Sequence, residues 1–373
     1  MLYATRAPID LKAIRRNLKA VRERVGGDRL VLAAVKANAY GHGAVRVAEM
    51  IEDSGAADWL GVATVDEGVE LRRAGIKLPI LKFTPTRGKK EIEAALAHDL
   101  VLTVVDVDGV AAVAKAAKRQ RRDKVKVHLK VDTGMRRVGC TPEEAPGLAQ
   151  LIDDAKFLRL DGLYSHLPVS DVDAGREFTA SQIELFARVV AAVEAARGPV
   201  PLKHLANSGG VLGHPESWLD MVRPGLMIYG HYPDPEAERT VEITPAMRLE
   251  TKVLFVKRVK QGEAVGYGRT WTAPADTWIA TLPVGYGDGY SRLLSNRGRV
   301  LIDGASYPIV GRVCMDQTMI DLGPKTRVEV GDEAVLIGRS GDEEITVAEI
   351  AELMGTIPYE VTCLITGRVE RTF

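Results

Sequence analysis

Short apolar runs alternate with amphipathic stretches through most of this chain. Eight runs have the length and β-branched content of buried strands, at residues 31–35, 59–64, 79–84, 100–106, 124–132, 157–166, 202–207 and 220–230. Amphipathic stretches such as 107–118 and 174–197 lie between them and predict helices. This alternation predicts an α/β domain. Eight strands would close a (β/α)8 TIM barrel, although a doubly wound open sheet alternates in the same way.

The pattern changes near Tyr232. The segment 231–240 is polar and interrupted by proline, which is typical of a linker. Short β-rich runs follow at 246–260, 276–282, 298–302, 307–313, 318–321 and 333–337, with one helical stretch at 346–354. We therefore expect a barrel at residues 8–232 and a mainly-β C-terminal domain at residues 233–373.

Composition and charge narrow the class of protein. The chain has 373 residues, of which 46% are apolar and 27% charged, as in ordinary globular proteins. Lys plus Arg equals Asp plus Glu at 50 each, so we expect no nucleic-acid or membrane partner. No apolar run approaches the ~18–20 residues of a membrane span, and the N-terminus lacks the core of a signal peptide. Cys140, Cys314 and Cys363 form no CxxC pair, which predicts a cytoplasmic protein without disulfides or a metal site.

The first apolar run ends on a lysine that opens a polar turn. Lys36 follows residues 31–35, and Asn38, Tyr40 and Gly41 precede the next amphipathic stretch. The carboxyl ends of strands are where α/β proteins place their chemistry. One interpretation is a lysine that packs its stem and extends its amine into water. The other is a nucleophilic amine with a lowered pKa that forms a Schiff base.

Other strand ends carry side chains of the same kind. The run 124–132 ends with Lys130 and Asp132 on one face, and the glycine at 134 allows Arg137 to turn back. Two later runs bring His166 and Arg223 to strand ends. Each of these taken alone is common as a surface ion cluster or a structural histidine.

Glycine-containing turns follow the seventh and eighth runs. They contain Asn207 and Ser208 in one case and Gly225 and Leu226 in the other. Backbone N–H groups in such turns can bind a phosphate, and barrels place phosphate sites after strands seven and eight. The glycine-rich string 283–290 resembles a dinucleotide loop but lacks the helix that such a loop must open.

Six strings together resemble the alanine racemases. They are AVKANAYGHG at 34–43, VHLKVDTGMRRVG at 127–139, LYSHLPVSD at 163–171, VRPGLMIYG at 222–230, VGYGRTW at 265–271 and GRVCMDQTM at 311–319. They lie in family order on both predicted domains. One departure is GRVERTF at 367–373, which has glutamate where the family usually has proline. The sequence makes no prediction for the packing around that glutamate.

The resemblance implies pyridoxal 5'-phosphate as the cofactor, held by Lys36. It implies that Arg137 contacts the phenolic oxygen of the cofactor, that Arg223 faces its pyridine nitrogen, and that His166 links Arg223 to a catalytic tyrosine, Tyr267. Cofactor contacts, mostly to the phosphate, would come from Tyr40, Asn207, Ser208, Gly225, Leu226 and Tyr359. Substrate contacts would come from Arg137, Tyr286, Cys314, Met315 and Asp316. The family's lysine at the position of Lys130 can be carbamylated.

The implied activity is interconversion of L- and D-alanine, which supplies D-alanine for peptidoglycan. Lys36 and Tyr267 would act as two bases on opposite faces of the α-carbon, because a single base would tend to restore the original configuration. The residues 1–7 would join the β domain, and the enzyme would be a homodimer whose active sites each borrow a Tyr267.

Three alternatives follow from the same residues. A basic-amino-acid decarboxylase shares this architecture, but is expected to place a carboxylate where Arg223 stands and a reactive cysteine in the β domain. A racemase of broader specificity would accept serine or other small amino acids. A non-enzymatic carrier of the cofactor would need only the barrel, and the β domain with Tyr267 and Met315 argues against it.

Overall fold

A computed structural model describes residues 4–373 of the chain, which form two compact units. One unit is Lys12–Thr244, and the other joins the residues up to Leu11 to Pro245–Phe373. The division follows residue 244, whereas the sequence pattern places it after 232. Residues 233–244 stay with the first unit because they are hydrogen-bonded to it. The Asn17 amide both donates to and accepts from the Thr244 backbone at 2.9 Å.

The first unit contains a sheet of eight parallel strands. The strands are β2 (Leu30–Ala34), β3 (Trp59–Val62), β4 (Ile80–Pro85), β5 (Leu100–Val104), β6 (Val125–Lys130), β7 (Leu158–Tyr164), β8 (Leu202–His204) and β9 (Met221–Val222). Backbone hydrogen bonds join the end strands β8 and β9, from Asp220 N to Lys203 O (3.1 Å) and from Arg223 N to Ala206 O (2.9 Å). The predicted barrel is therefore confirmed, and the open sheet was the wrong alternative.

The barrel is filled with side chains. One apolar cluster takes a residue from each of five strands, namely Leu32, Trp59, Leu81, Val101 and Met221. Side chains from so many strands can meet only inside the barrel. Nearer the carboxyl ends of the strands the buried side chains include polar ones, with Tyr164, His204 and Arg223 all at most 5% exposed. The barrel thus changes from an apolar interior to a buried polar one toward the carboxyl ends of its strands.

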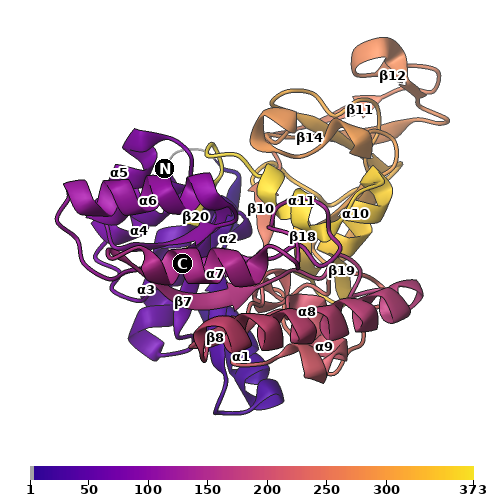
Figure 1. Cartoon of the computed structure of the whole chain (residues 1–373). Coiled ribbons are helices and arrows are strands. Elements are labelled where there is room, and N and C mark those ends of the chain that lie inside the picture. Colours follow the sequence, from indigo (N-terminus) through magenta and orange to yellow (C-terminus); the bar gives the residue numbers. More distant parts are fainter. Residues whose placement is uncertain (1–3) are drawn as a thin grey trace. The chain divides into compact units, whose positions relative to one another are not determined.

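Helices cover the outside of the barrel. They are α1 (Leu11–Val25), α3 (Ala44–Ser54), α4 (Val65–Arg73), α5 (Lys89–Ala97), α6 (Val107–Arg119), α7 (Ala145–Asp154) and α8 (Arg176–Arg197), with short turns α2 (Lys36–Tyr40) and α9 (Ser208–Gly213) and the 3-10 turns η1 (Asp173–Gly175), η2 (Pro215–Ser217) and η3 (Leu226–Tyr229). Consecutive helices from α3 to α8 contact one another around the barrel (Figure 1). The N-cap residues are of the types that favour this position: Thr64 and Asp106 accept backbone N–H groups at the starts of α4 and α6.

The second unit is mainly β. One sheet contains β1 (Arg6–Pro8), β10 (Leu249–Lys252), β15 (Arg299–Ile302), β16 (Ala305–Pro308), β18 (Glu333–Ser340), β19 (Glu343–Ile345) and β20 (Glu370–Thr372). A second sheet contains β11 (Phe255–Val259), β14 (Thr277–Leu282) and β17 (Thr318–Gly323), and a ribbon is formed by β12 (Ala264–Val265) and β13 (Trp271–Thr272). The strand β1 pairs with β10 and β20, so the first and last strands of the described residues lie in the same sheet.

Three details of this unit differ from the pattern. The run 246–260 is two strands, because the chain leaves one sheet after Lys252 and enters another at Phe255. The run 307–313 stops as a strand at Pro308. A second helix, α11 (Pro358–Leu364), follows α10 (Val347–Met354), so the expectation of one helix was wrong. Proline at the first position of α11 is a helix-start signal that could have revealed it.

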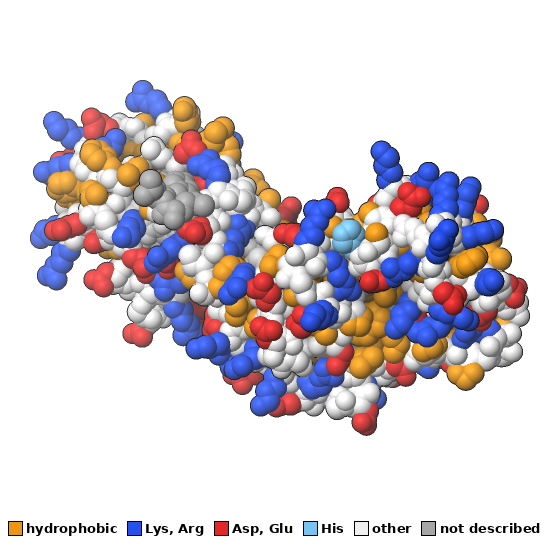
Figure 2. Space-filling model, turned by 90° about the vertical axis from the view of Figure 1, so that its left-hand side faces the viewer, with side chains coloured by type: hydrophobic (Ala, Val, Ile, Leu, Met, Phe, Trp, Pro, Cys, Tyr) orange, Lys and Arg blue, Asp and Glu red, His pale blue; other side chains and the backbone are white. Residues whose placement is uncertain are grey.

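Charge is mixed on the surface. Figure 2 shows Lys and Arg side chains interspersed with Asp and Glu over the face in view. Within residues 4–373, no helix combines the length and the apolar character needed to cross a membrane.

Candidate active site

Lys36 lies at the start of a turn with unusual backbone geometry. The residues after it, Ala37, Asn38, Ala39 and Tyr40, have φ values of 51°, 54°, 53° and 53°. This is the left-handed helical region, which costs an L-residue roughly 1–2 kcal/mol because Cβ approaches the following carbonyl. Among these four residues only the asparagine is of a type that visits this region readily. Four consecutive residues in this conformation need support from the surrounding structure.

Contacts on both sides supply this support. His42 stacks on Tyr229 at 4.5 Å between ring centroids and bonds the carbonyls of Ala39 and Tyr40. Asn38 Oδ1 accepts the N–H of Ala44 at 2.8 Å, where α3 begins. The Ala37 N–H donates to Glu67 Oε1 on α4 at 2.7 Å.

Tyr40, Ser208 and Gly225 converge on one small region. Gly225 N donates to Ser208 Oγ at 3.0 Å. A Cβ at position 225 would lie 2.6 Å from Tyr40 Oη, so a larger residue there would displace the Tyr40 side chain. Ser208 opens α9, whose N-cap Asn207 accepts the Gly210 N–H. Leu226 begins the 3-10 turn η3. Backbone N–H groups and two hydroxyls in this cradle suit a phosphate group.

Arg223 is a buried cation held by neutral acceptors. Its guanidinium donates to Ser165 O (2.7 Å), Leu205 O (3.0 Å) and His204 Nδ1 (3.0 Å), and lies 3.5 Å from His166 Nδ1. Burial lowers the pKa of Arg223 to about 10, so it stays charged at neutral pH. Burial and the nearby cations, led by Arg223, lower the pKa of His166 well below its ordinary value. Among the described residues, no carboxylate forms an ion pair with Arg223.

Lys130 is the second amine of the site. It ends β6, is 7% exposed, and lies with its Nζ 5.4 Å from the centroid of the Tyr164 ring. Burial and the charges of Arg223 and Arg137 lower the pKa of Lys130 to about 8. The loop that carries Arg137 turns back at Gly134, with φ 156°, and Asp132 Oδ1 accepts the Gly134 and Arg136 N–H groups.

The barrel thus brings together the residues predicted on its strand ends. Lys36, Lys130, Arg137 and Arg223 are near enough for each to act on the pKa of His166. Sequence reasoning missed His204, Tyr164 and Glu67. His204 and Tyr164 are polar residues inside otherwise buried strands, and inward register near a strand end was the available signal. Glu67 was visible as part of a Thr64–Glu67 capping box.

In the β unit, two loops hold another set of predicted residues together. Tyr286 N donates to Cys314 O at 3.0 Å, and Gly287 N donates to Met315 O at 2.9 Å. A Cβ on Gly285 would lie 2.2 Å from Cys314 O, so this approach requires glycine. Arg368 bonds Asp316 at 2.8 Å and pairs with the buried Asp288 at 3.2 Å.

Tyr267 and Tyr359 occupy other elements of the same unit. Tyr267 opens the 3-10 turn η4 (Tyr267–Arg269) between Gly266 and Gly268, both with φ 74°, and is 74% exposed. Tyr359 is the second residue of α11. Glu370, the departure near the C-terminus, lies in β20 opposite Arg6 of β1.

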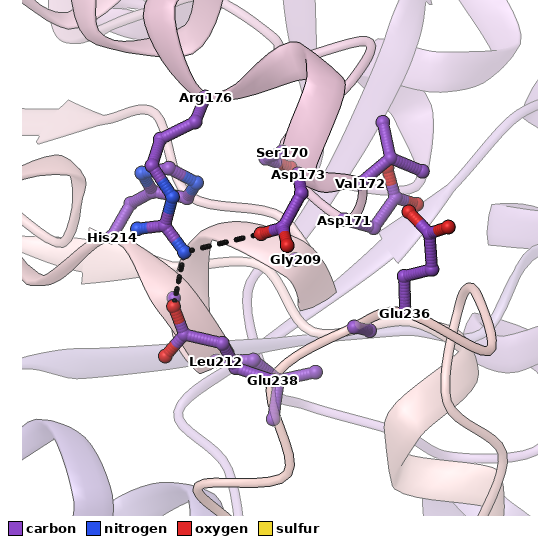
Figure 3. Close-up of a pocket in the computed structure, with 12 residues that line it drawn as sticks. Ser170, Asp171, Val172, Asp173, Arg176, Gly209, Leu212, His214, Glu236 and Glu238 are labelled. Carbon is purple, nitrogen blue, oxygen red and sulfur yellow. Dashed lines mark hydrogen bonds and ion pairs between the residues drawn. The ribbon is translucent and has the colours of Figure 1, made fainter.

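A further pocket lies in the barrel unit beside Gly209 (Figure 3). It is an open hollow of about 300 Å³. Arg176 there bonds Glu238 at 2.7 Å and lies 3.5 Å from Asp173. None of the residues predicted for the site lines this pocket, and its arginine is already paired with carboxylates.

A closed parallel barrel with amines and a buried arginine at the carboxyl ends of its strands has the architecture of a barrel enzyme. Family models agree with the strings in the sequence: "Alanine racemase, N-terminal domain" matches residues 9–233, and "Alanine racemase, C-terminal domain" matches residues 246–373. The chain therefore belongs to the alanine racemase family.

Individual relatives cover nearly the whole chain. The alanine racemase of Cutibacterium acnes is 53% identical over 365 residues, covering 98% of this chain and 96% of its own. The solved alanine racemase of Clostridium difficile is 34% identical with a TM-score of 0.93, covering 100% of this chain and 96% of its own. The alanine racemase of Bacillus anthracis, solved with bound L-Ala-P, is 36% identical with a TM-score of 0.93. This match covers 100% of this chain and 95% of the Bacillus chain.

Proposed function

We propose that this protein is an alanine racemase that interconverts L- and D-alanine with pyridoxal 5'-phosphate and supplies D-alanine for peptidoglycan. The observation that carries the proposal is the buried Arg223, which together with Lys36 acts on the pKa of His166, in a chain with full-length racemase relatives. An arginine keeps its proton, whereas a decarboxylase is expected to have a carboxylate there.

The residues present fit the cofactor. Lys36 would hold it covalently, and the cradle of Tyr40, Ser208 and Gly225 would bind its phosphate. Asn207 and Leu226 position that cradle at the starts of α9 and η3. Arg223 would offer a fixed positive charge to the ring nitrogen of the cofactor, and Arg137 would offer one to its phenolic oxygen. When bound, pyridoxal phosphate supplies an electron sink that makes the α-proton of an amino acid acidic.

Two side chains of this protein would move the proton. The Lys36 amine would serve one face of the α-carbon and the Tyr267 hydroxyl the other, so each direction of racemisation uses one as base and the other as acid. The Met315 N–H would bind the substrate carboxylate, with Arg137, Tyr286, Cys314 and Asp316 around it. Tyr359 would contribute to phosphate binding. Tyr267 would come from the second subunit of a homodimer.

The test is α-hydrogen exchange in deuterated water. Both L- and D-alanine should gain deuterium and converge on the racemic mixture, with no release of CO2. Release of CO2 from a basic amino acid without racemisation would overturn the proposal in favour of a decarboxylase. Serine measured in the same assay defines how broad the specificity is.

A further inference from the structure

The left-handed turn after Lys36 begins with a donor that the turn itself does not satisfy. Within the turn and its exit, Ala39 N bonds Val35 O, Gly41 N bonds Ala37 O and Gly43 N bonds Asn38 O. The Ala37 N–H, one peptide unit from the Lys36 Cα, points outward instead and donates to Glu67 Oε1 at 2.7 Å. This contact joins residues 30 positions apart in the chain.

Glu67 uses its two oxygens for different tasks. Oε2 accepts the N–H groups of Ala63 (2.7 Å) and Thr64 (3.0 Å), which completes the capping box at the start of α4. A capping box needs no more than this from its glutamate. The remaining oxygen, Oε1, is directed to the lysine turn. One carboxylate therefore ties the start of the left-handed turn to the start of a regular helix with charge-assisted hydrogen bonds.

We propose that Glu67 is a positioning residue that holds the left-handed turn and thereby fixes where Lys36 presents its amine. The turn is strained along Ala37–Tyr40, so its first peptide relaxes unless it is held. The Asn38 side chain ties the turn to the start of α3, and Glu67 ties the first peptide of the turn, next to the lysine. The inference extends the proposed function, in which Lys36 holds the cofactor.

The experiment compares Glu67→Ala with Thr64→Ala in the full-length protein without cofactor. Both changes remove half of the same capping box, since the Thr64 hydroxyl accepts Glu67 N at 3.2 Å. Only Glu67→Ala removes the bond to Ala37. Hydrogen–deuterium exchange is followed in peptides covering 37–43 and, as a reference for global opening, in peptides from β6. Borohydride trapping of added pyridoxal phosphate on Lys36 is timed in parallel by peptide mapping.

Glu67→Ala should speed exchange in 37–43 about tenfold or more, as expected for loss of a charge-assisted hydrogen bond, and slow trapping on Lys36 by a similar factor. Thr64→Ala should speed exchange only at the start of α4 and leave trapping within about twofold, since the bond to Ala37 remains. Unchanged exchange in 37–43 together with unchanged trapping in Glu67→Ala would overturn the inference.

Two additions to the experiment separate failure of the inference about Glu67 from failure to fold and from failure of the proposed function. If Glu67→Ala does not accumulate as folded protein, Glu67→Gln takes its place, since a neutral amide with one acceptor oxygen cannot reproduce both sets of bonds. Faster exchange in 37–43 is still expected, and exchange equal to that of the parent would contradict the inference. The exchange measurement needs no catalysis. If the parent protein traps no pyridoxal phosphate on Lys36, the proposed function is refuted. The hydrogen–deuterium exchange result still decides whether Glu67 holds the turn.

Discussion

Hydrogen bonds inside the barrel determine which nitrogen of the buried His204 carries the proton. Arginine only donates, so His204 Nδ1 must accept from Arg223 and His204 Nε2 must carry the proton. That proton is donated to His128 Nδ1 at 2.9 Å. Burial lowers the pKa of both histidines, that of His128 to about 4, so both are neutral. The positive charge near the site is therefore concentrated on Arg223, Arg137 and the two lysines, and a bound anionic cofactor would relieve their repulsion.

Lys130 gives a prediction at the scale of one residue. Its pKa is about 8 in the folded protein and 10.5 in its ordinary state. Between these values the unfolded chain binds more protons, so the free energy of unfolding should rise with pH. Below pH 8 the folded state bears the full cost of the buried charge, about 3 kcal/mol at most. We expect Lys130→Gln to be more stable than the parent at pH 7, with the difference shrinking as pH rises toward 10.5.

The measurement is urea unfolding of both proteins without cofactor from pH 7 to 10.5. Buffers must be free of CO2, because carbamylation of the amine would replace the cation with an anion. The expectation fails if the difference between the two proteins does not change with pH.

At the scale of elements, the turn α2 makes the sharpest prediction. Ala37 is exposed but lies in the left-handed region, which costs roughly 1–2 kcal/mol for alanine and nothing for glycine. Glycine adds about 0.5–1 kcal/mol of backbone entropy in the unfolded chain. Ala37→Gly should therefore raise the free energy of unfolding of the barrel unit by about 0.5–1 kcal/mol.

Ala111 is the matched control. It is exposed in the regular helix α6, so Ala111→Gly should lower stability by about 1 kcal/mol. The change in the free energy of unfolding should thus have opposite signs at these two exposed alanines, as measured by urea unfolding midpoints. Equal losses at both positions would show that position 37 is not left-handed in solution.

The same turn shows where prediction from sequence ends. The barrel strands were predictable because most are nearly continuous apolar runs. The same runs placed Lys36, Lys130, His166 and Arg223 at strand ends, and only the family resemblance assigned roles to them. Barrel closure then brings them together. Ala37, Ala39 and Tyr40 carry no sign of left-handed backbone. Glu67, His42 and Tyr229 impose that conformation from outside the turn, and such contacts have no pattern in a single sequence.

The β unit shows a related limit. Its strands alternate in two sheets, and the change of sheet between β10 and β11 occurs inside one apolar run. Nothing local marks that crossing, because Val253 and Leu254 are apolar like Phe255 and Val256, which begin the next strand. The loops carrying Tyr286 and Met315 were recognised only through their resemblance to a family. Their contact depends on close backbone approach at Gly285, which three-dimensional packing decides.

At the scale of the whole molecule, the β unit exposes aromatic and sulfur-containing side chains where a soluble monomer rarely needs them. Tyr267 is 74% exposed, Met315 53% and Tyr286 42%. These are residues that the family resemblance assigns to the active site. A tyrosine so exposed is a poor proton carrier unless another surface desolvates it and fixes its hydroxyl. The homodimer proposed above would provide such a surface.

The shared site is testable by mixing two inactive proteins. Lys36→Ala and Tyr267→Phe should each abolish racemisation, because each removes one of the two bases. After subunit exchange, half of the sites in a mixed dimer lack both groups, while the other half combine an intact Lys36 with an intact Tyr267 from the second subunit. Activity should therefore return toward about a quarter of the parent value at random mixing. Differently tagged subunits, purified in two steps, establish that mixed dimers formed. If such dimers stay inactive, each barrel uses its own tyrosine, and the two-subunit site is refuted while Lys36 and Tyr267 remain the two bases.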